Sequence, residues 1–409
     1  LDADFPDTPV MVSHVSMHGA VLNSLALKKY NISAATKTPP GGIITRKPGS
    51  NEPAGLVMEM AYLPIFANLP KPTADEERSW SHAAQQLYAQ AGITTAHEGA
   101  THLSDLALMQ RVSTAGGNQI DIVAYPFITE LDAILKSNPP SSFGQYNNGL
   151  KLGGAKITID GSVQGRTALF TTPYLVEGPN GEKPWKGVAP FTQQQLNQMV
   201  KQVYDLGLPL DLHANGDGAI DMLLAAHEFA AAGDLEKERH VTAVHSQFVR
   251  RDQLDKYRKY KITPSFFTQH TYFFADTHLV LRGKQQTDFI SPMRTAIDMG
   301  LRPSNHTDFV VTPLDQLFVI WTAVNRISRN GVLIGGDERI TPLEALEAIT
   351  LSAARQHGDE QTKGSLEPGK LADMVILSAN PLTVEPMQIK DIKVVETFKQ
   401  GRRIYPQQL

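Results

Sequence analysis

Residues 208–245 read LPLDLHANGDGAIDMLLAAHEFAAAGDLEKERHVTAVH, and this stretch decides the fold. Two apolar runs, 208–213 and 241–245, each end in a histidine and have the length of a buried strand. Between them, residues 218–232 are typical of a helix, and Gly233 is a suitable residue to end it. A strand, a helix and a second strand of this kind predict a βαβ unit with two parallel strands.

The same alternation of strands and helices extends on both sides of this unit. Further strands are expected at 93–97, 120–125, 150–159, 263–267 and 301–305, and helices at 80–91, 103–115, 193–206, 251–260 and 292–300. About seven mostly apolar strands with helices between them predict an α/β protein. The expected architecture is a (β/α)8 TIM-type barrel whose first strand is missing from the sequence. A doubly wound open sheet is the competing architecture, although no Gly-rich phosphate loop follows any strand.

Both ends of the chain differ from this pattern. Residues 1–80 are rich in Pro and Gly, and they predict a loop-rich segment inserted in the barrel or packed on it. The barrel itself is expected at 81–357. After a helix at 342–357, short strands at 373–377, 392–399 and 402–405 predict a small appended β-sandwich-like layer within 358–409.

The bulk composition limits the classes of function. The 409 residues carry a formal net charge of −4, which gives no support to a nucleic-acid partner. No apolar run is long enough to predict a membrane span. Cysteine is absent, so any metal would have to be held by His, Lys or carboxylate side chains. A small-molecule substrate is the expected partner, while a homo-oligomer and the choice between cytoplasm and periplasm stay open. Because the chain begins at Leu1, we expect its natural start to lie upstream.

Of the five apolar strands expected between residues 150 and 305, four are each associated with one strong metal ligand or base. These residues are Lys156, His213, His245 and Asp308. A single histidine at a strand end is more often a hydrogen-bonded core residue than a ligand. A lysine inside an apolar strand is harder to explain without a function, because a buried ammonium is costly unless it is paired or modified. Because active sites of parallel barrels lie at the carboxyl ends of the strands, we interpret the four residues as one site.

These residue types suit a divalent metal ion, with zinc the expected ion and one or two ions bound. A lysine that has added carbon dioxide becomes a carbamate, which is anionic and can bridge two metals. Bound metal lowers the pKa of water towards about 7, and a nearby carboxylate can then move the proton. The predicted chemistry is hydrolysis by metal-activated water.

At this point the sequence resembles the amidohydrolase superfamily, in particular the branch of the YtcJ-like proteins and the N-substituted formamide deformylases. The similarity runs nearly end to end. It is carried by five segments of the chain: His18–Leu27, Gly92–Glu98, Lys156–Arg166, His213–Asp217 and Gly364–Asp373. The last of them matches the C-terminal signature of the superfamily, which leads the chain back into the small β-layer.

The resemblance implies a role for each candidate. Lys156 becomes the carboxylated bridging ligand, His213 and His245 become ligands of one metal, and Asp308 becomes a ligand of the other metal and the proton shuttle. The family has two more ligands, a His-x-His pair at the end of the first strand, which this sequence lacks. We expect that the pair lies in a leading segment that is not part of this chain.

Three residues are candidates for substrate binding. His18 resembles a family position that faces the pocket. His270 follows the strand 263–267 within an aromatic run, which either lines the pocket or packs on itself. Arg166 either orients a substrate carboxylate or braces a loop. His97 and Glu98 end an early strand and are candidates for the surroundings of the metal.

The resulting prediction is an enzyme, a metal-dependent amidohydrolase that acts on a non-peptide C–N bond of an amide or cyclic amide. The alternative is a catalytically silent protein of the same fold that serves in binding or regulation. The four candidate ligands favour the enzyme, and the missing pair favours the alternative. Neither the fold nor the motifs identify the substrate.

Overall fold

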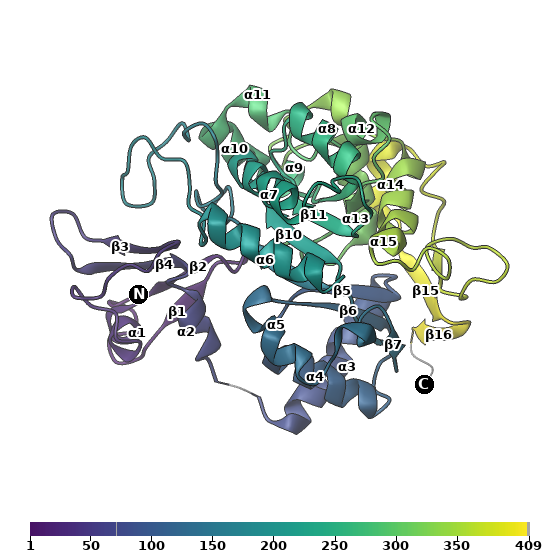
Figure 1. The fold of residues 1–409 in the computed structure, drawn as a ribbon, viewed down its shortest axis with the longest axis horizontal. Helices are drawn as coiled ribbons and strands as arrows, with labels where there is room; N and C mark the ends of the chain where they lie inside the picture. The colour runs from purple at the N-terminus through teal and green to yellow at the C-terminus, as the bar shows by residue number, and fades with distance from the viewer. Residues whose placement is uncertain (71, 407–409) are drawn as a thin grey trace.

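The structure is a computed structural model that describes residues 1–70 and 72–406 (Figure 1). In Figure 1, a small N-terminal sheet lies at one side of the molecule, and a small C-terminal sheet lies at the opposite side. Parallel strands occupy the centre, and helices surround them. The described residues contain no helix with the length and apolar character needed to cross a membrane.

The N-terminal segment is more ordered than the sequence predicted. Four strands form an antiparallel sheet in the order β1-β2-β4-β3, accompanied by two short helices. Their bounds are β1 Met11–Ser13, β2 Gly19–Leu22, β3 Gly42–Arg46, β4 Pro53–Glu59, α1 Ser24–Lys29 and α2 Leu63–Ala67. Buried Leu22, Ile44, Val57 and Tyr62 form a separate core cluster. These strands were not predicted, because strands of three to seven residues between long turns leave little periodicity. The loop-rich segment inserted in the barrel or packed on it stays a prediction.

The central sheet contains five parallel strands in the order β13-β12-β11-β10-β9. The strands are β9 Ala155–Thr158, β10 Leu210–Ala214, β11 Val241–His245, β12 Ile262–Phe266 and β13 Ser304–Asn305. The helices between them are α6 Gln193–Asp205, α7 Asp217–Ala230, α8 Arg251–Tyr260, α9 His270–Phe273, α10 Ala275–Arg282, α11 Lys284–Thr287 and α12 Met293–Asp298. Every residue of β10 and β11 is buried, which confirms the predicted βαβ unit.

A second sheet holds three parallel strands, β5 Thr95–Thr101, β6 Asp121–Pro126 and β8 Leu150–Leu152, and the short antiparallel β7 Tyr146–Asn147. Its helices are α3 Ala74–Gln90, α4 Leu103–Thr114 and α5 Ile128–Leu135, with a 3-10 turn, η1, at Pro140–Ser142. The strand predicted at 150–159 is divided here between two sheets, since β8 pairs with β6 and β9 pairs with β10. Gly153 and Gly154 lie between the two strands. A Cβ atom on Gly153 would come within 2.3 Å of the Tyr125 ring, and one on Gly154 would come within 2.3 Å of the Pro209 carbonyl oxygen.

The two parallel sheets are joined by a single parallel bridge between Phe127 and Lys156. At the far ends of the series, β5 and β13 are edge strands, so no closed barrel forms among residues 1–70 and 72–406. The α/β class and the order of parallel strands agree with the prediction. Closure of an eight-stranded barrel stays a prediction.

The C-terminal residues form three short strands near the expected positions, while a sandwich-like layer stays a prediction. The sheet is antiparallel and has the order β14-β15-β16, with β14 Met374–Leu377, β15 Val394–Lys399 and β16 Arg402–Tyr405. The preceding elements are α13 Gln316–Asn325, η2 Gly336–Glu338, α14 Pro342–Ile349 and α15 Leu351–Gln356, and η3 Pro386–Asp391 follows β14. Lys399 ties the layer to the second sheet, with Nζ 2.7 Å from Asp121 and 2.6 Å from Asp373. The predicted domain boundaries at residues 80 and 357 stay predictions.

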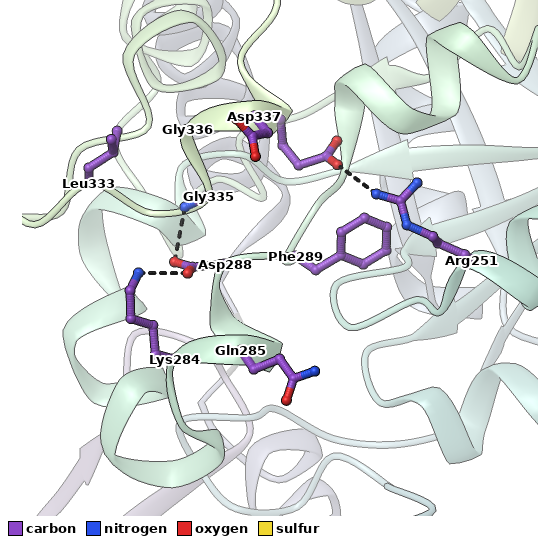
Figure 2. A pocket seen from close by; sticks show the side chains of 10 residues that line it. Arg251, Lys284, Gln285, Asp288, Phe289, Leu333, Gly335, Gly336 and Asp337 are labelled. Carbon is purple, nitrogen blue, oxygen red and sulfur yellow. Dashed lines mark hydrogen bonds and ion pairs between the residues drawn. The ribbon is translucent and has the colours of Figure 1, made fainter.

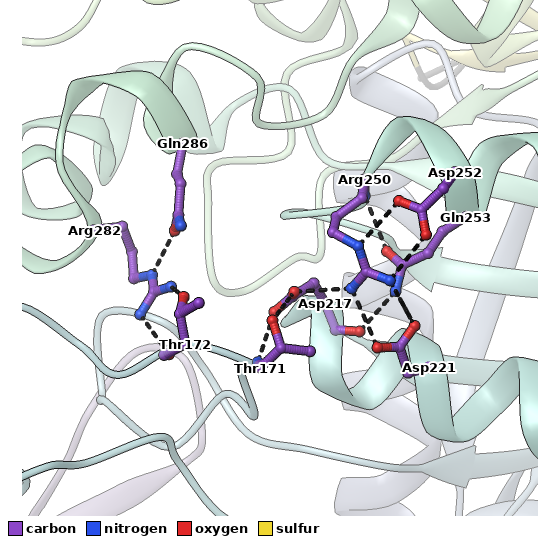
Figure 3. Close-up of polar contacts among 9 residues, drawn as sticks. All are labelled: Thr171, Thr172, Asp217, Asp221, Arg250, Asp252, Gln253, Arg282 and Gln286. Atoms are coloured by element: carbon purple, nitrogen blue, oxygen red, sulfur yellow. Dashed lines mark hydrogen bonds and ion pairs between the residues drawn. The ribbon is translucent and has the colours of Figure 1, made fainter.

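A long connection, residues 159–192, follows β9 and is held by two arginines (Figure 3). Arg282 donates to the carbonyl oxygens of Thr172 and Pro173 at 3.2 and 2.8 Å, and its guanidinium lies 3.8 Å from the Phe170 ring centroid. Arg250 pairs with Asp217, which in turn accepts hydrogen bonds from Thr171. The connection is thus pinned to α7 and α10.

We expect Arg282→Met to lower the free energy of unfolding by about 2–3 kcal/mol, because the change leaves part-buried carbonyls without a charged donor while keeping much of the apolar stem. Urea denaturation measures the effect. Arg239→Met is the matched control, since Arg239 also donates to two carbonyls and lies over a tyrosine ring, but at the surface. It should cost less than about 1 kcal/mol. Equal losses in the two variants would contradict the role given to Arg282.

Candidate active site

The structure brings His213 and His245 side by side. They lie on the neighbouring strands β10 and β11, and their ring centroids are 4.5 Å apart at an interplanar angle of 84°. Burial lowers the pKa of both imidazoles well below the usual value. Charge repulsion from Lys156 lowers the pKa of His213 further, and repulsion from His213 does the same for His245. Both side chains are therefore neutral near pH 7, which is the form that binds a metal ion.

Lys156 is buried in β9, next to β10. Burial lowers the pKa of its ammonium, while the carboxylates of Asp211 and Asp308 oppose that shift. Its charge in turn lowers the pKa of both His213 and His245. Lys156 is paired in register with Asp211, two residues before His213 on β10, so Lys156 and His213 face the same side of the sheet.

Asp308 lies three residues beyond β13, in a tight turn with φ of 49°. Burial raises the pKa of its carboxyl, and the nearby cations of Lys156 and His18 counter this rise. His213 and His245 thus lie at or near the carboxyl ends of β10 and β11, Asp308 follows β13, and Lys156 lies within β9. That the four form one site stays a prediction.

The N-terminal sheet contributes His18 to the same region. The ring centroid of His18 is 5.8 Å from that of His213. Its Nδ1 lies 3.1 Å from both carboxylate oxygens of Glu59, and Glu59 also accepts a hydrogen bond from Thr167. Burial alone would lower the pKa of His18, but Glu59 reverses the direction and raises it. Sequence reasoning missed Glu59, because 41 residues separate it from His18 and no motif links them.

Asp160 and Asn215 surround His213. Asp160 is buried and accepts hydrogen bonds from the backbone N–H groups of Leu169, Asn215 and Gly216. Burial raises the pKa of Asp160 to about 7 despite these donors. Its Oδ1 lies 3.7 Å from Nε2 of His213, and Nδ2 of Asn215 lies 3.0 Å from the same nitrogen. Both residues hold the ring of His213 in position.

A second histidine group lies around Asp211. Nε2 of His97 is 3.1 Å from Oδ2 of Asp211, and the rings of His97 and His357 are 4.8 Å apart. The contact lacks hydrogen-bond geometry, so among the described residues both oxygens of the buried Asp211 have no hydrogen-bond partner. Burial lowers the pKa of His357 well below its usual value.

The two other candidates for substrate binding, His270 and Arg166, have different surroundings. His270 is buried, and its ring lies 6.1 Å from that of His245 and 4.1 Å from that of Phe267. The neighbouring Tyr272 instead packs against Phe318 and Trp321, so the aromatic run packs largely on α13.

Arg166 donates to the carbonyl oxygens of Glu177 and Gly178, which is the loop-bracing geometry. In the described part of the chain, no contact joins its guanidinium to the four predicted ligands.

Two surface cavities lie elsewhere. One, of about 290 Å³, is lined by Arg251, Lys284, Asp288, Phe289 and Glu338 among others (Figure 2). The other, of about 450 Å³, lies between residues 46–51 and Asn180. Neither cavity includes a predicted ligand.

The residues present fit a divalent metal ion in their chemistry. Two adjoining neutral imidazoles, a buried lysine and a buried carboxyl are donor types that zinc accepts, once the lysine is converted to a carbamate. The orphaned Oδ1 of Asn215 beside His213 also fits a site with room for a polar ligand. Within residues 1–70 and 72–406, no three His, Asp or Glu side chains converge in ligating geometry. A complete coordination sphere is therefore a matter of proposal.

The chain is similar in sequence to known amidohydrolases. A sequence model described as "Amidohydrolase family" matches residues 1–405. The protein named "Putative amidohydrolase YtcJ" of Bacillus subtilis (strain 168) is 26% identical over 99% of this chain and 75% of its own length. The "N-substituted formamide deformylase" of Arthrobacter pascens is 24% identical over 98% of this chain and 74% of its own length. The resemblance to this branch is confirmed.

A solved structure shares the fold. The crystal structure of an uncharacterized metal-dependent hydrolase from Pyrococcus horikoshii OT3 superposes with a TM-score of 0.72 and 23% identity. The match covers 93% of this chain and 73% of the other. At this level of identity the likeness concerns the fold alone.

Proposed function

This chain belongs to the amidohydrolase family, and from that premise we propose that it is a metal-dependent hydrolase of a non-peptide C–N bond, in an N-substituted amide or a cyclic amide. The observation that carries the proposal is the pair of neutral imidazoles, His213 and His245, beside a buried lysine. Few structural roles require a lysine and two histidines to be buried together, because burial of polar groups is costly unless they are used.

In this proposal His213, His245, Asp308 and the carbamate of Lys156 hold one or two ions, with zinc as the expected metal. A divalent ion held there supplies polarisation of the scissile carbonyl and lowers the pKa of water to about 7. Asp308 takes a proton from the attacking water and passes it to the departing nitrogen. The pKa of Asp308 is raised by burial, which makes its carboxylate a better proton acceptor near neutral pH.

His18 and His270 are the proposed substrate contacts. His18 donates its Nδ1–H to Glu59, which also raises the pKa of the imidazole. In the protonated form that Glu59 favours, Nε2–H is left to donate a hydrogen bond to a carbonyl or carboxylate of the substrate. His270 would form the wall next to His245. Arg166 has a weaker claim as a substrate contact, because its Nη1 already donates to two carbonyl oxygens of the loop.

The test combines metal content with a substrate panel. Elemental analysis of the purified protein should find at least one divalent ion per chain, and a chelator should abolish hydrolysis until zinc is returned. N-substituted formamides, after the deformylase relative, and cyclic amides form the panel. A His213→Asn, His245→Asn double variant serves as the control and should retain neither metal nor activity.

The alternative is a catalytically silent member of the family that binds a ligand or a partner. One observation favours it, namely that no three His, Asp or Glu side chains of the described residues converge on a metal position. Protein that remains free of metal after incubation with zinc, and that hydrolyses nothing in the panel, would support this alternative and refute the enzyme.

A further inference from the structure

His306 lies directly behind His245, in a position that neither the motifs nor the ligand predictions single out. Its Nε2 is 3.0 Å from Nδ1 of His245, and its Nδ1 is 3.0 Å from Oγ of Ser265 on β12. The ring stacks on Phe267 with centroids 5.3 Å apart and an interplanar angle of 29°. Its backbone N–H donates to the carbonyl oxygen of Phe266. The side chain is therefore held from two sides, by stacking and by hydrogen bonds.

The three side chains form a directional chain. A neutral imidazole ring has one N–H donor and one acceptor nitrogen, so a neutral His306 donates at one of its two contacts and accepts at the other. A His245 that binds a metal ion is neutral too, and its 3.0 Å contact with His306 needs one ring to donate and the other to accept. Only two arrangements of protons then satisfy both 3.0 Å contacts, and they run in opposite directions along Ser265, His306 and His245. The hydroxyl of Ser265 can serve at either end, because it both donates and accepts.

The two arrangements differ in what they leave on His245. In one, Nδ1–H of His245 donates to His306, Nδ1–H of His306 donates to Ser265, and Nε2 of His245 has a free lone pair. In the other, Nδ1 of His245 accepts from His306, and Nε2 must carry the proton. In the described structure, the hydrogen bonds of the His245 side chain involve Nδ1 alone. Only the first arrangement leaves Nε2 able to bind a metal ion.

We propose that His306 is a positioning residue that fixes the tautomer and the ring orientation of His245, with Ser265 as the end of the chain. The inference rests on the proposed metal site and goes beyond it, since it assigns a residue outside the ligand set. Histidine ligands usually donate their second N–H to a carboxylate, a carbonyl or water, and loss of such a partner lowers metal affinity by about 10–100-fold. Here a neutral imidazole supplies the acceptor.

Two substitutions at His306 separate positioning from packing. His306→Phe keeps a ring against Phe267 but removes both nitrogens, so zinc affinity should fall by about 10–100-fold. His306→Gln keeps an acceptor oxygen on a side chain of similar reach and should recover most of that loss. Ser265→Ala removes only the end of the chain and should have a smaller effect. Competition with a chromophoric chelator measures the dissociation constant of zinc for each full-length variant.

His227→Phe is the matched control. His227 is a buried histidine of α7 with two hydrogen bonds, to Tyr204 and to the carbonyl oxygen of Leu235. It should lower stability while leaving zinc affinity unchanged. Zinc binding by His306→Phe at wild-type affinity, or a loss that His306→Gln fails to recover, would overturn the positioning role.

A second measurement is independent of metal. Nitrogen-15 spectra of histidine-labelled, metal-free protein report which nitrogen of His245 carries the proton, with His245→Asn for assignment. Wild type should be protonated at Nδ1, and His306→Phe should shift His245 towards the Nε2–H form. Wild type that binds no zinc but shows this tautomer would refute the proposed function and keep the role of His306. Wild type protonated at Nε2 would refute the role itself.

Discussion

Lys156→Ala should abolish metal-dependent hydrolysis, with a loss of at least about 10³-fold in kcat/KM, or more than 4 kcal/mol of transition-state stabilisation. An unmodified ammonium at this position would lie against the metal cations, where both charge repulsion and desolvation disfavour it. A carbamate removes the positive charge and supplies two oxygens as ligands. Burial lowers the pKa of Lys156, so a larger fraction of neutral amine is available to add carbon dioxide at neutral pH.

The measurements for Lys156→Ala are metal content and turnover, with and without added formate or acetate. A short carboxylate can occupy the space of the missing carbamate and should restore part of both. Because only the neutral amine adds carbon dioxide, acidic buffer should strip the metal from wild type. Full metal occupancy and activity in Lys156→Ala would contradict the assignment.

Lys151→Met is the matched control for this experiment. Lys151 is also a buried strand lysine, but its Nζ pairs with Asp359 at 2.6 Å and donates to the carbonyl oxygen of His357. Its loss removes the nearest cation of Asp359, which keeps the hydroxyl of Tyr146 at 2.6 Å and Lys363 at 3.8 Å, so stability should fall by up to about 3 kcal/mol. The folded fraction should nevertheless bind metal with the wild-type stoichiometry.

Asp308→Asn should lower kcat by about 10²–10⁴-fold, because the amide keeps the shape of the side chain but cannot accept a proton. KM should change much less than kcat if the main loss is proton transfer. Steady-state kinetics on the best substrate of the panel measure both constants. A kcat within tenfold of wild type would remove Asp308 from the proton-transfer role.

Asp315→Asn provides the control for Asp308→Asn. Asp315 caps the first turn of α13, where its side chain accepts a hydrogen bond from the backbone N–H of Phe318 at 3.0 Å. Asparagine caps helices about as well as aspartate, so stability should change by less than about 1 kcal/mol. Turnover should stay at the wild-type level.

The centre of the fold could be predicted because its signals are local. Strands buried on both faces are continuous apolar runs, and β11 and α8 have the bounds expected from the sequence alone. Helix α13 was not predicted from the sequence. Its residues from Leu317 to Asn325 are all buried except Phe318. A helix that is apolar all round has no amphipathic period and reads like a buried strand. The N-terminal sheet was missed because its strands are too short to show a period.

In the candidate site, too, some contacts could be predicted from the sequence and others could not. That His213 and His245 would meet followed from their sequence, because consecutive parallel strands end at the same edge of a sheet. The hydrogen-bond partners Glu59 and Ser265 could not be predicted in this way. Glu59 is 41 residues from His18 in the sequence, and Ser265 is 41 residues from His306. The sequence by itself determined the family, the α/β class and the residue types at the strand ends, because these depend on local pattern. Only the tertiary structure decided which side chains hold and orient those residues, because hydrogen-bond partners are chosen by proximity in space and leave no periodic signal along the chain.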